Sequence, residues 1–226
     1  MALTGYPFPY DVNNLTGGRT RILYAPTSQA IPANMDDIFE MDGGGYVVKG
    51  SWLDLGATKE ASSYARGFDT GAWEIQQVVG AVVEEVTDVT RTLTVSFADF
   101  KPEHLQIIEN APSIATLAAA AGRSAQKQVS FGAFSSITRY RFAFVQQRSK
   151  QSGIVTESAG AGSGTRGRFL CGVLYDAQIS ADEVTFEQAK GELTGVGVTF
   201  TGFPASGQPT GQEYGTWLDE LAGTIT

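Results

Sequence analysis

Alternating apolar and small polar residues mark the middle of the chain as β-strand. Leu93, Val95 and Phe97 are separated by Thr and Ser residues, so one face of this run is apolar and the other carries hydroxyls. Similar runs precede it around Trp73 and over residues 82–89. This pattern predicts three strands of one half-buried sheet.

A short helix is predicted directly after these strands. Pro102 suits the first turn of a helix, and Glu103 places a carboxylate near the positive end of the helix dipole. Leu105 and Ile108 recur at the helical spacing, and Asn110 ends the pattern. We therefore expect a helix from Pro102 to Asn110 whose two apolar residues cover the sheet.

Shorter patterns predict the other elements. Apolar, β-branched and aromatic runs predict strands at residues 21–25, 128–134, 139–147, 168–175, 184–190 and 194–200. The 168–175 run is apolar on both faces and is expected to be a central strand. Residues 113–121 are predicted as a helical turn or a loop, and residues 214–221 as a helical turn anchored by Trp217. Eight or nine strands and one helix predict an all-β fold, a β-sandwich or barrel with one flanking α-helix.

Four segments are interpreted as arms or loops of a single domain spanning residues 1–226. They are an N-terminal arm (1–20), a long loop or loose hairpin (26–46), a Gly-rich flexible stretch (149–167) and a C-terminal extension (202–226). The long loop carries Ile31, Met35, Ile38 and Phe39, which are costly to expose to water. We therefore predict that this loop docks on a partner.

The acidic balance of the chain limits its partners. A formal net charge of −8 argues against a protein that grips nucleic acid through its phosphates, but not against one past which DNA slides. Three acids fall on the predicted 82–89 strand, where alternation places Glu84 and Asp88 on one face and Glu85 on the other. We interpret them as a solvated or lumen-facing row of charge.

The sequence offers no catalytic or metal-binding constellation. His104, the one histidine, is expected on the helix surface, and no Ser stands in a nucleophile elbow. The single cysteine, Cys171, lies in an apolar run and is expected to be a buried, inert thiol. The acids Asp36, Asp37, Glu40 and Asp42 lack the spacing of a calcium loop. We predict no enzymatic activity, no cofactor and no metal.

The N-terminal residues and the hydropathy of the chain argue against a membrane role. No basic region followed by an apolar one opens the sequence, so no signal peptide is expected. No run approaches the ~18 apolar residues of a membrane span. We therefore predict no association with a membrane.

Three segments, taken in order, carry a resemblance to a known family. They are GSWLDLGATKE at residues 50–60, GFDTGAWEIQQ at residues 67–77 and EEVTDVTRTLTVSFADFKPEHLQIIENA at residues 84–111. The series resembles the middle of the major tail tube proteins of bacteriophages with long, non-contractile tails, in particular phages of actinobacteria. It covers residues 45–112, and the rest of the chain agrees only in layout.

This resemblance implies both a fold and a role. It implies a β-sandwich flanked by a helix, related in architecture to type VI secretion tube proteins. It implies homohexameric rings that stack into a tail tube, assembled in the host cytoplasm, through which DNA passes to the host without tight binding. The tape-measure, tail-terminator and distal tail proteins would be further partners. Ile31, Met35, Ile38 and Phe39 are then candidates for contacts between subunits, and Glu84, Glu85 and Asp88 for charge in the lumen.

Two other functional classes remain open at this point. A carbohydrate-binding or adhesive β-sandwich on a virion surface would stack an exposed Trp52 or Trp73 against sugar. A glycosidase would use Glu84 or Glu85 together with Asp88 as its carboxylate pair.

Overall fold

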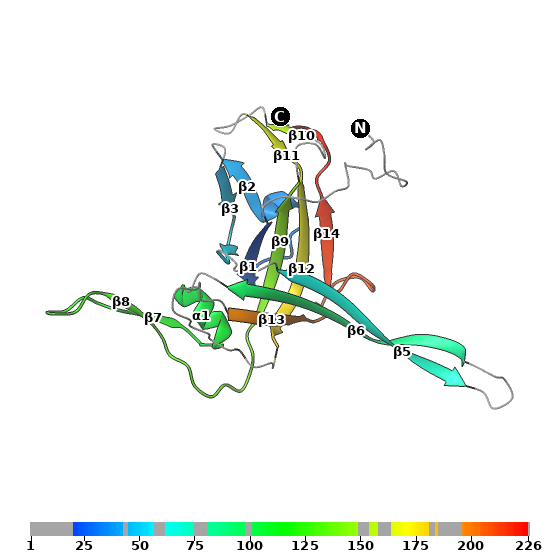
Figure 1. The fold of residues 1–226 in the computed structure, drawn as a ribbon, viewed down its shortest axis with the longest axis horizontal. Coiled ribbons are helices and arrows are strands. Elements are labelled where there is room, and N and C mark those ends of the chain that lie inside the picture. The colour runs from blue at the N-terminus through cyan, green and yellow to red at the C-terminus, as the bar shows by residue number, and fades with distance from the viewer. Residues whose placement is uncertain are drawn as a thin grey trace, which may run out of the picture. The chain divides into compact units, whose positions relative to one another are not determined.

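The described part of the chain is mostly β-structure and contains one α-helix (Figure 1). The computed structural model describes residues 20–42, 45–56, 62–74, 81–97, 101–148, 154–157, 164–180, 184 and 196–225. Strands make up 54% of the protein and helices 7%, which confirms the predicted all-β class with one helix. The predicted arm at residues 1–19 and most of the predicted strand at residues 184–190 lie outside the described residues.

The chain divides into two compact units, each assembled from segments that are distant in sequence. The first unit comprises Met1–Leu55, Tyr140–Tyr175 and Gly207–Thr226, and the second comprises Gly56–Arg139 and Asp176–Ser206. The organisation as one domain stays a prediction, and each unit is described by itself below.

An antiparallel sheet forms the first unit. Its strands are β1 (Thr20–Pro26), β4 (Leu53–Asp54), β9 (Arg139–Gln147), β12 (Phe169–Ile179) and β14 (Gly215–Asp219), paired in the order β4-β1-β9-β12-β14. Two smaller sheets join β2 (Phe39–Asp42) to β3 (Gly45–Val48), and β10 (Ile154–Glu157) to β11 (Gly164–Gly167) and β15 (Gly223–Ile225). The Gly-rich stretch predicted to be flexible therefore contributes two strands, β10 and β11.

The strand β12 is buried on both faces, as predicted for a central strand. Cys171 is fully buried within it, and this burial raises the pKa of its thiol to about 12. Gly172 lies so close to the neighbouring strand that a Cβ there would come within 2.0 Å of the Phe144 ring. Phe144 in turn packs edge-on against Trp217, with ring centroids 5.2 Å apart.

The C-terminal segment differs from its predicted helical turn. Residues 215–219 form β14, whose register pairs Trp217 with Gly172 of β12. The short pattern around Trp217 suits a helical turn locally, but pairing with the edge of β12 satisfies the backbone over five residues and decides the structure.

The second unit is built around a long antiparallel hairpin. Its elements are β5 (Ser63–Glu74), β6 (Ala81–Phe97), α1 (Pro102–Ile108), β7 (Ile114–Leu117), β8 (Gln126–Val129) and β13 (Val196–Gly202). Within this unit β13 pairs with residues 177–179 of β12 on one side and with β6 on the other, and β5 pairs with β6. The core is formed by Leu93, Val95, Phe97, Val198 and Phe200, all of them 2% exposed or less.

Three sequence predictions about the strands of this unit are wrong. The strand predicted at residues 128–134 is β8, which covers Gln126–Val129 and ends there. The runs at 82–89 and 93–97 were predicted as separate strands, but β6 continues through both because no Gly or Pro interrupts them. Residues 114–117 form β7 and pair with β8, rather than forming a helical turn or a loop. Residues 114–117 form a strand because they pair with β8, and the local sequence does not reveal this partner.

The helix α1 begins at Pro102 as predicted. It ends in a Schellman motif, because the amide of Ala111 donates to the Gln106 carbonyl at 2.9 Å and that of Asn110 to the Ile107 carbonyl at 3.2 Å. Asn110 adopts the left-handed conformation that this motif requires, with a φ of 48°. Its side chain then holds the segment before β9, accepting from the Thr138 amide and donating to the Ser136 carbonyl, each at 2.8 Å.

The buried face of α1 differs from the predicted one. Ile107 and Ile108 are buried, whereas Leu105 is only half-buried. His104, predicted on the surface, is 1% exposed and packs beside Phe97 with ring centroids 5.3 Å apart. The predicted face is right for Ile108 and wrong for Leu105, because a seven-residue helix offers few apolar positions from which to fix its buried face.

Candidate assembly surface

The part of the β5–β6 hairpin that extends beyond β13 is an exposed part of the second unit. The pairing of β13 with β6 covers residues 92–97, whereas β5 and β6 stay paired as far as Glu74 and Ala81 (Figure 1). We call residues 66–74 and 81–91 the β5–β6 ribbon. A two-stranded ribbon is marginally stable in water by itself, so a ribbon of this length favours burial against a partner.

One face of the ribbon is a shallow groove lined by two arginines and three apolar residues. The lining residues are Arg66, Phe68, Val86, Val89 and Arg91, and they enclose about 280 Å³. Phe68 is 56% exposed and Val86 is 54% exposed, which leaves apolar area open to water. The Arg66 guanidinium lies 5.8 Å from the centre of the Phe68 ring. We call this side the groove face.

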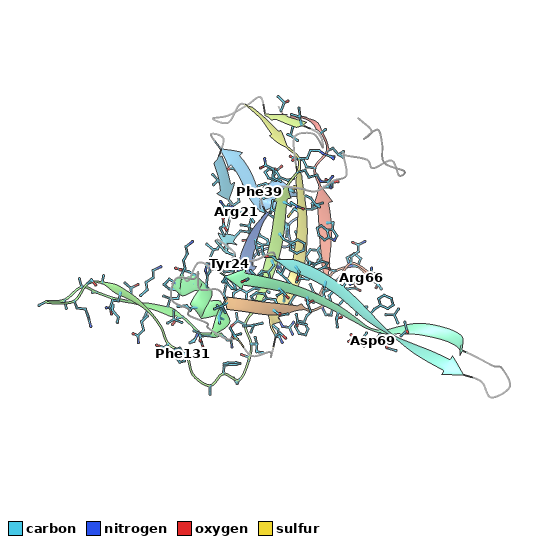
Figure 2. All side chains as sticks on the ribbon, viewed as in Figure 1. Arg21, Tyr24, Phe39, Arg66, Asp69 and Phe131 are labelled. Atoms are coloured by element: carbon cyan, nitrogen blue, oxygen red, sulfur yellow. The ribbon has the colours of Figure 1, made fainter. Side chains whose placement is uncertain are left out.

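Like charges lie directly opposite each other at two points of the ribbon. Arg66 pairs with Arg91 across the strands, and three residues further on Asp69 pairs with Asp88. Because side chains alternate between the faces of a strand, the two acids belong to the side opposite the groove, which we call the acidic face. Figure 2 shows Arg66 and Asp69 on this ribbon. Directly opposed like charges destabilise a sheet, and a partner of opposite charge would relieve this repulsion.

The predicted lumen acids lie in the same ribbon. Asp88 is exposed, and one of its carboxylate oxygens accepts from the Val89 amide at 2.8 Å. Glu84 and Glu85 belong to β6, but their side chains lie outside the described residues. A register shift between Asp69 and Thr70 breaks the alternation along the ribbon, so the prediction that Glu84 and Asp88 share a face no longer follows from counting residues.

The four residues proposed for subunit contacts lie in the first unit and divide into two pairs. Ile38 is fully buried and Phe39 is 4% exposed, with the Phe39 ring 5.0 Å from that of Phe169. Their own unit covers them, so their apolar character is no longer evidence for a partner. Ile31 and Met35 are half-buried.

The acids of the same segment serve local structure. Residues 35–37 form a 3₁₀-helix in which Asn34 and Asp37 make a capping box, with the Asp37 amide donating to the Asn34 side chain at 3.1 Å. Glu40 pairs with Lys49 at 2.6 Å, and this hydrogen bond raises the pKa of Lys49. The segment predicted as a long loop or loose hairpin is thus a 3₁₀-helix followed by the β2–β3 hairpin.

Another exposed region of the second unit follows β8. Phe131, labelled in Figure 2, is 73% exposed, and Phe134 is 57% exposed. The β7–β8 hairpin before them is tied to α1 by an ion pair of 2.6 Å between Lys127 and Glu103, which lowers the pKa of the Glu103 carboxyl. Apolar side chains this exposed are a second sign of contact with another molecule.

The described residues contain no group of three or more His, Cys, Asp or Glu side chains placed to hold a metal ion.

Trp52, which would need to be exposed to stack on sugar, is 3% exposed. In the part of the chain that the structure describes, no helix is long and apolar enough to cross a membrane. The side chain of Trp73 lies outside the described residues.

Sequence reasoning missed the groove face because small residues conceal the start of β5. Ser63, Ala65 and Gly67 interrupt an otherwise regular alternation of larger residues, which are Tyr64, Arg66 and Phe68. Reading only those alternate positions would have identified the strand, but not the residues of β6 that complete the groove face. No family model matches the chain, and a search of curated proteins finds no match either.

Proposed function

We propose that this chain is the structural subunit of a bacteriophage tail tube. Six copies form a ring, the rings stack into a tube, and DNA passes through the lumen from the capsid to the host. The resemblance of residues 45–112 to major tail tube proteins supports this role. The all-β fold with one helix is compatible with it.

The β5–β6 ribbon is the observation that carries the proposal. Its strands of 12 and 17 residues extend beyond the sheet, and they expose both apolar side chains and unpaired edges. Such edges promote uncontrolled aggregation in a monomer, but neighbouring copies cover them in a closed ring or an ordered stack. A ribbon of this kind therefore supports self-assembly better than it supports a solitary binding module.

The two differently charged faces of the ribbon support repeated assembly in particular. A contact between unlike surfaces of identical copies is heterologous, and it produces closed rings or open filaments instead of dimers. A tail tube needs both outcomes, rings within each layer and a filament along its axis. Under this proposal the virion tail is the place of the protein, and tape-measure, tail-terminator and distal tail proteins meet the ends of the tube.

Negative-stain electron microscopy of the concentrated, purified protein tests the proposal. We expect rings with six-fold symmetry and tubes of constant diameter. Particles that stay single at every concentration, or that form only irregular aggregates, would argue for a different role.

A further inference from the structure

We infer that the groove face of the β5–β6 ribbon binds the acidic face of the same ribbon in a second copy of the chain. The contact sets Arg66 and Arg91 of one copy against Asp69 and Asp88 of the next. This inference rests on the proposed self-assembly and names the surface that performs it.

The spacing of the charges fits such a contact. Arg66 and Arg91 are directly opposed across the two strands, and so are Asp69 and Asp88. Directly opposed residues of an antiparallel pair have Cα atoms about 4.5–5.5 Å apart, so the separation of the two arginines and that of the two acids differ by no more than about 1 Å. The exposed Arg66 guanidinium can then meet a carboxylate of the next copy, with the half-buried Arg91 adding positive charge beside it.

The shapes of the two faces also agree. The groove face carries the large side chains, with Phe68 and Val86 more than half exposed. The acidic face carries small ones, because Ala65 lies opposite Thr92 and Gly67 lies opposite Thr90. Gly67 keeps this face low, since a Cβ there would come within 2.6 Å of the Thr90 hydroxyl. The low surface at Gly67, next to the acids on the same face, leaves room for the exposed Phe68 of an approaching copy.

A second copy is favoured over other occupants because the ribbon carries both halves of the contact. Each copy offers one basic and one acidic face, so every copy binds one neighbour with each. A net charge of −8 opposes random association of copies, and the local arginine pair supplies the attraction that overcomes it. The register of the two pairs also fixes the direction of the array.

Paired charge reversals test the inference. The variant R66E/R91E makes both faces acidic, and the variant D69K/D88K makes both faces basic. Each should lose rings and tubes when alone, raising the concentration needed for assembly at least about tenfold, because like charges facing each other across an interface oppose association. Light scattering against protein concentration measures this threshold.

The decisive experiment mixes the two variants in equal amounts. The glutamates of one variant then face the lysines of the other, and the remaining arginines face the remaining aspartates, so alternating copies should assemble again. The quadruple variant R66E/R91E/D69K/D88K should assemble by itself for the same reason. The charge-preserving controls R66K/R91K and D69E/D88E should stay close to the wild-type threshold.

The thermal midpoint of each variant, measured by circular dichroism below the assembly threshold, shows that loss of assembly is not loss of folding. Replacing Asp88 by Asn should raise this midpoint slightly, because it removes a like-charge pair, while weakening assembly. A variant that is merely misfolded would lower the midpoint and would not be restored by mixing.

The outcomes separate this inference from the function on which it rests. If the wild type assembles and either reversed variant assembles at the same concentration, the ribbon contact is wrong and the tube proposal stands. If both variants fail and their mixture also fails, the two faces do not meet each other. If the wild type never assembles, the proposed function itself is overturned.

Discussion

Asn110 shows how one residue joins local and long-range structure. It adopts the left-handed conformation that ends α1, and its amide side chain also fixes Ser136 and Thr138 before β9. Glycine would accept the backbone conformation but could not make the two side-chain bonds. The position thus requires both a tolerated positive φ and a short amide, which Asn combines.

Substitutions at Asn110 should separate these two requirements. Asn110→Gly removes two hydrogen bonds and should lower the free energy of unfolding by about 1–2 kcal/mol. Asn110→Ala adds the cost of a left-handed alanine, about 1–2 kcal/mol more. Urea denaturation of the wild type and both variants measures these free energies of unfolding, which should fall from wild type to Gly to Ala. Equal stability of the Ala and Gly variants would show that the backbone conformation is not under strain there.

His104 behaves as a core residue in the described structure. Its ring packs beside Phe97 at 1% exposure, so truncation leaves a cavity in the second unit. We expect His104→Ala to cost about 2 kcal/mol or more by analogy with other large-to-small changes in cores. The half-buried Leu105, changed to Ala, is the matched control on the same helix and should cost less. If His104→Ala left the stability unchanged and Leu105→Ala lowered it, the result would show that Leu105, and not His104, lies on the buried face of α1.

At the scale of elements, two positions of the first unit require glycine because neighbouring strands approach them closely. Gly215 of β14 lies so near β12 that a Cβ there would come within 2.1 Å of the Val173 carbonyl oxygen. That oxygen belongs to the backbone, so the strands themselves would have to separate. At Gly172, by contrast, the obstacle is the movable Phe144 ring.

Gly215→Ala should therefore destabilise the protein by about 1–3 kcal/mol, the usual range for overpacking. Gly197→Ala is the matched control, because Gly197 is also a strand residue and nothing lies within 4 Å of its Cβ position. The control should be neutral or stabilise by up to about 1 kcal/mol. Thermal unfolding of both variants checks the difference, and a loss of stability in the control alone would contradict it.

Elements whose signal is local were predicted well from the sequence. The strand β9 has the predicted limits, and α1 starts at the predicted proline. Elements fixed by a distant partner were missed, including β14, which pairs with β12, and β7, which pairs with β8. The groove face was missed for a related reason, since Arg66 and Arg91 are 25 positions apart and only the register of the hairpin brings them together.

At the scale of the whole molecule, the net charge bears on the proposed passage of DNA through a tube. Each copy carries a formal −8, so six copies carry 6 × −8 = −48. Repulsion of phosphates is screened within about 10 Å at ~0.1 M salt, which suits a lining that repels DNA only at close range. The inferred contact covers two arginines of one copy together with two aspartates of the next, so it leaves this net charge unchanged.

We therefore expect assembled protein to show no measurable binding of double-stranded DNA at physiological salt. Fluorescence anisotropy of a labelled duplex, titrated with tubes and with unassembled protein, provides the measurement. Strong binding that weakens steeply with added salt would instead indicate contacts with phosphates and a nucleic-acid-binding role.

The central claim is that copies of this chain assemble into six-membered rings, and the mass of the particles tests it most directly. One copy has a mass of 24.0 kDa, so a ring has 6 × 24.0 = 144 kDa and stacked rings have multiples of it. Native mass spectrometry across a concentration series should show the monomer giving way to 144 kDa and its multiples. A single species of 24.0 kDa at every concentration, or a series that does not pass through six copies, would contradict the account.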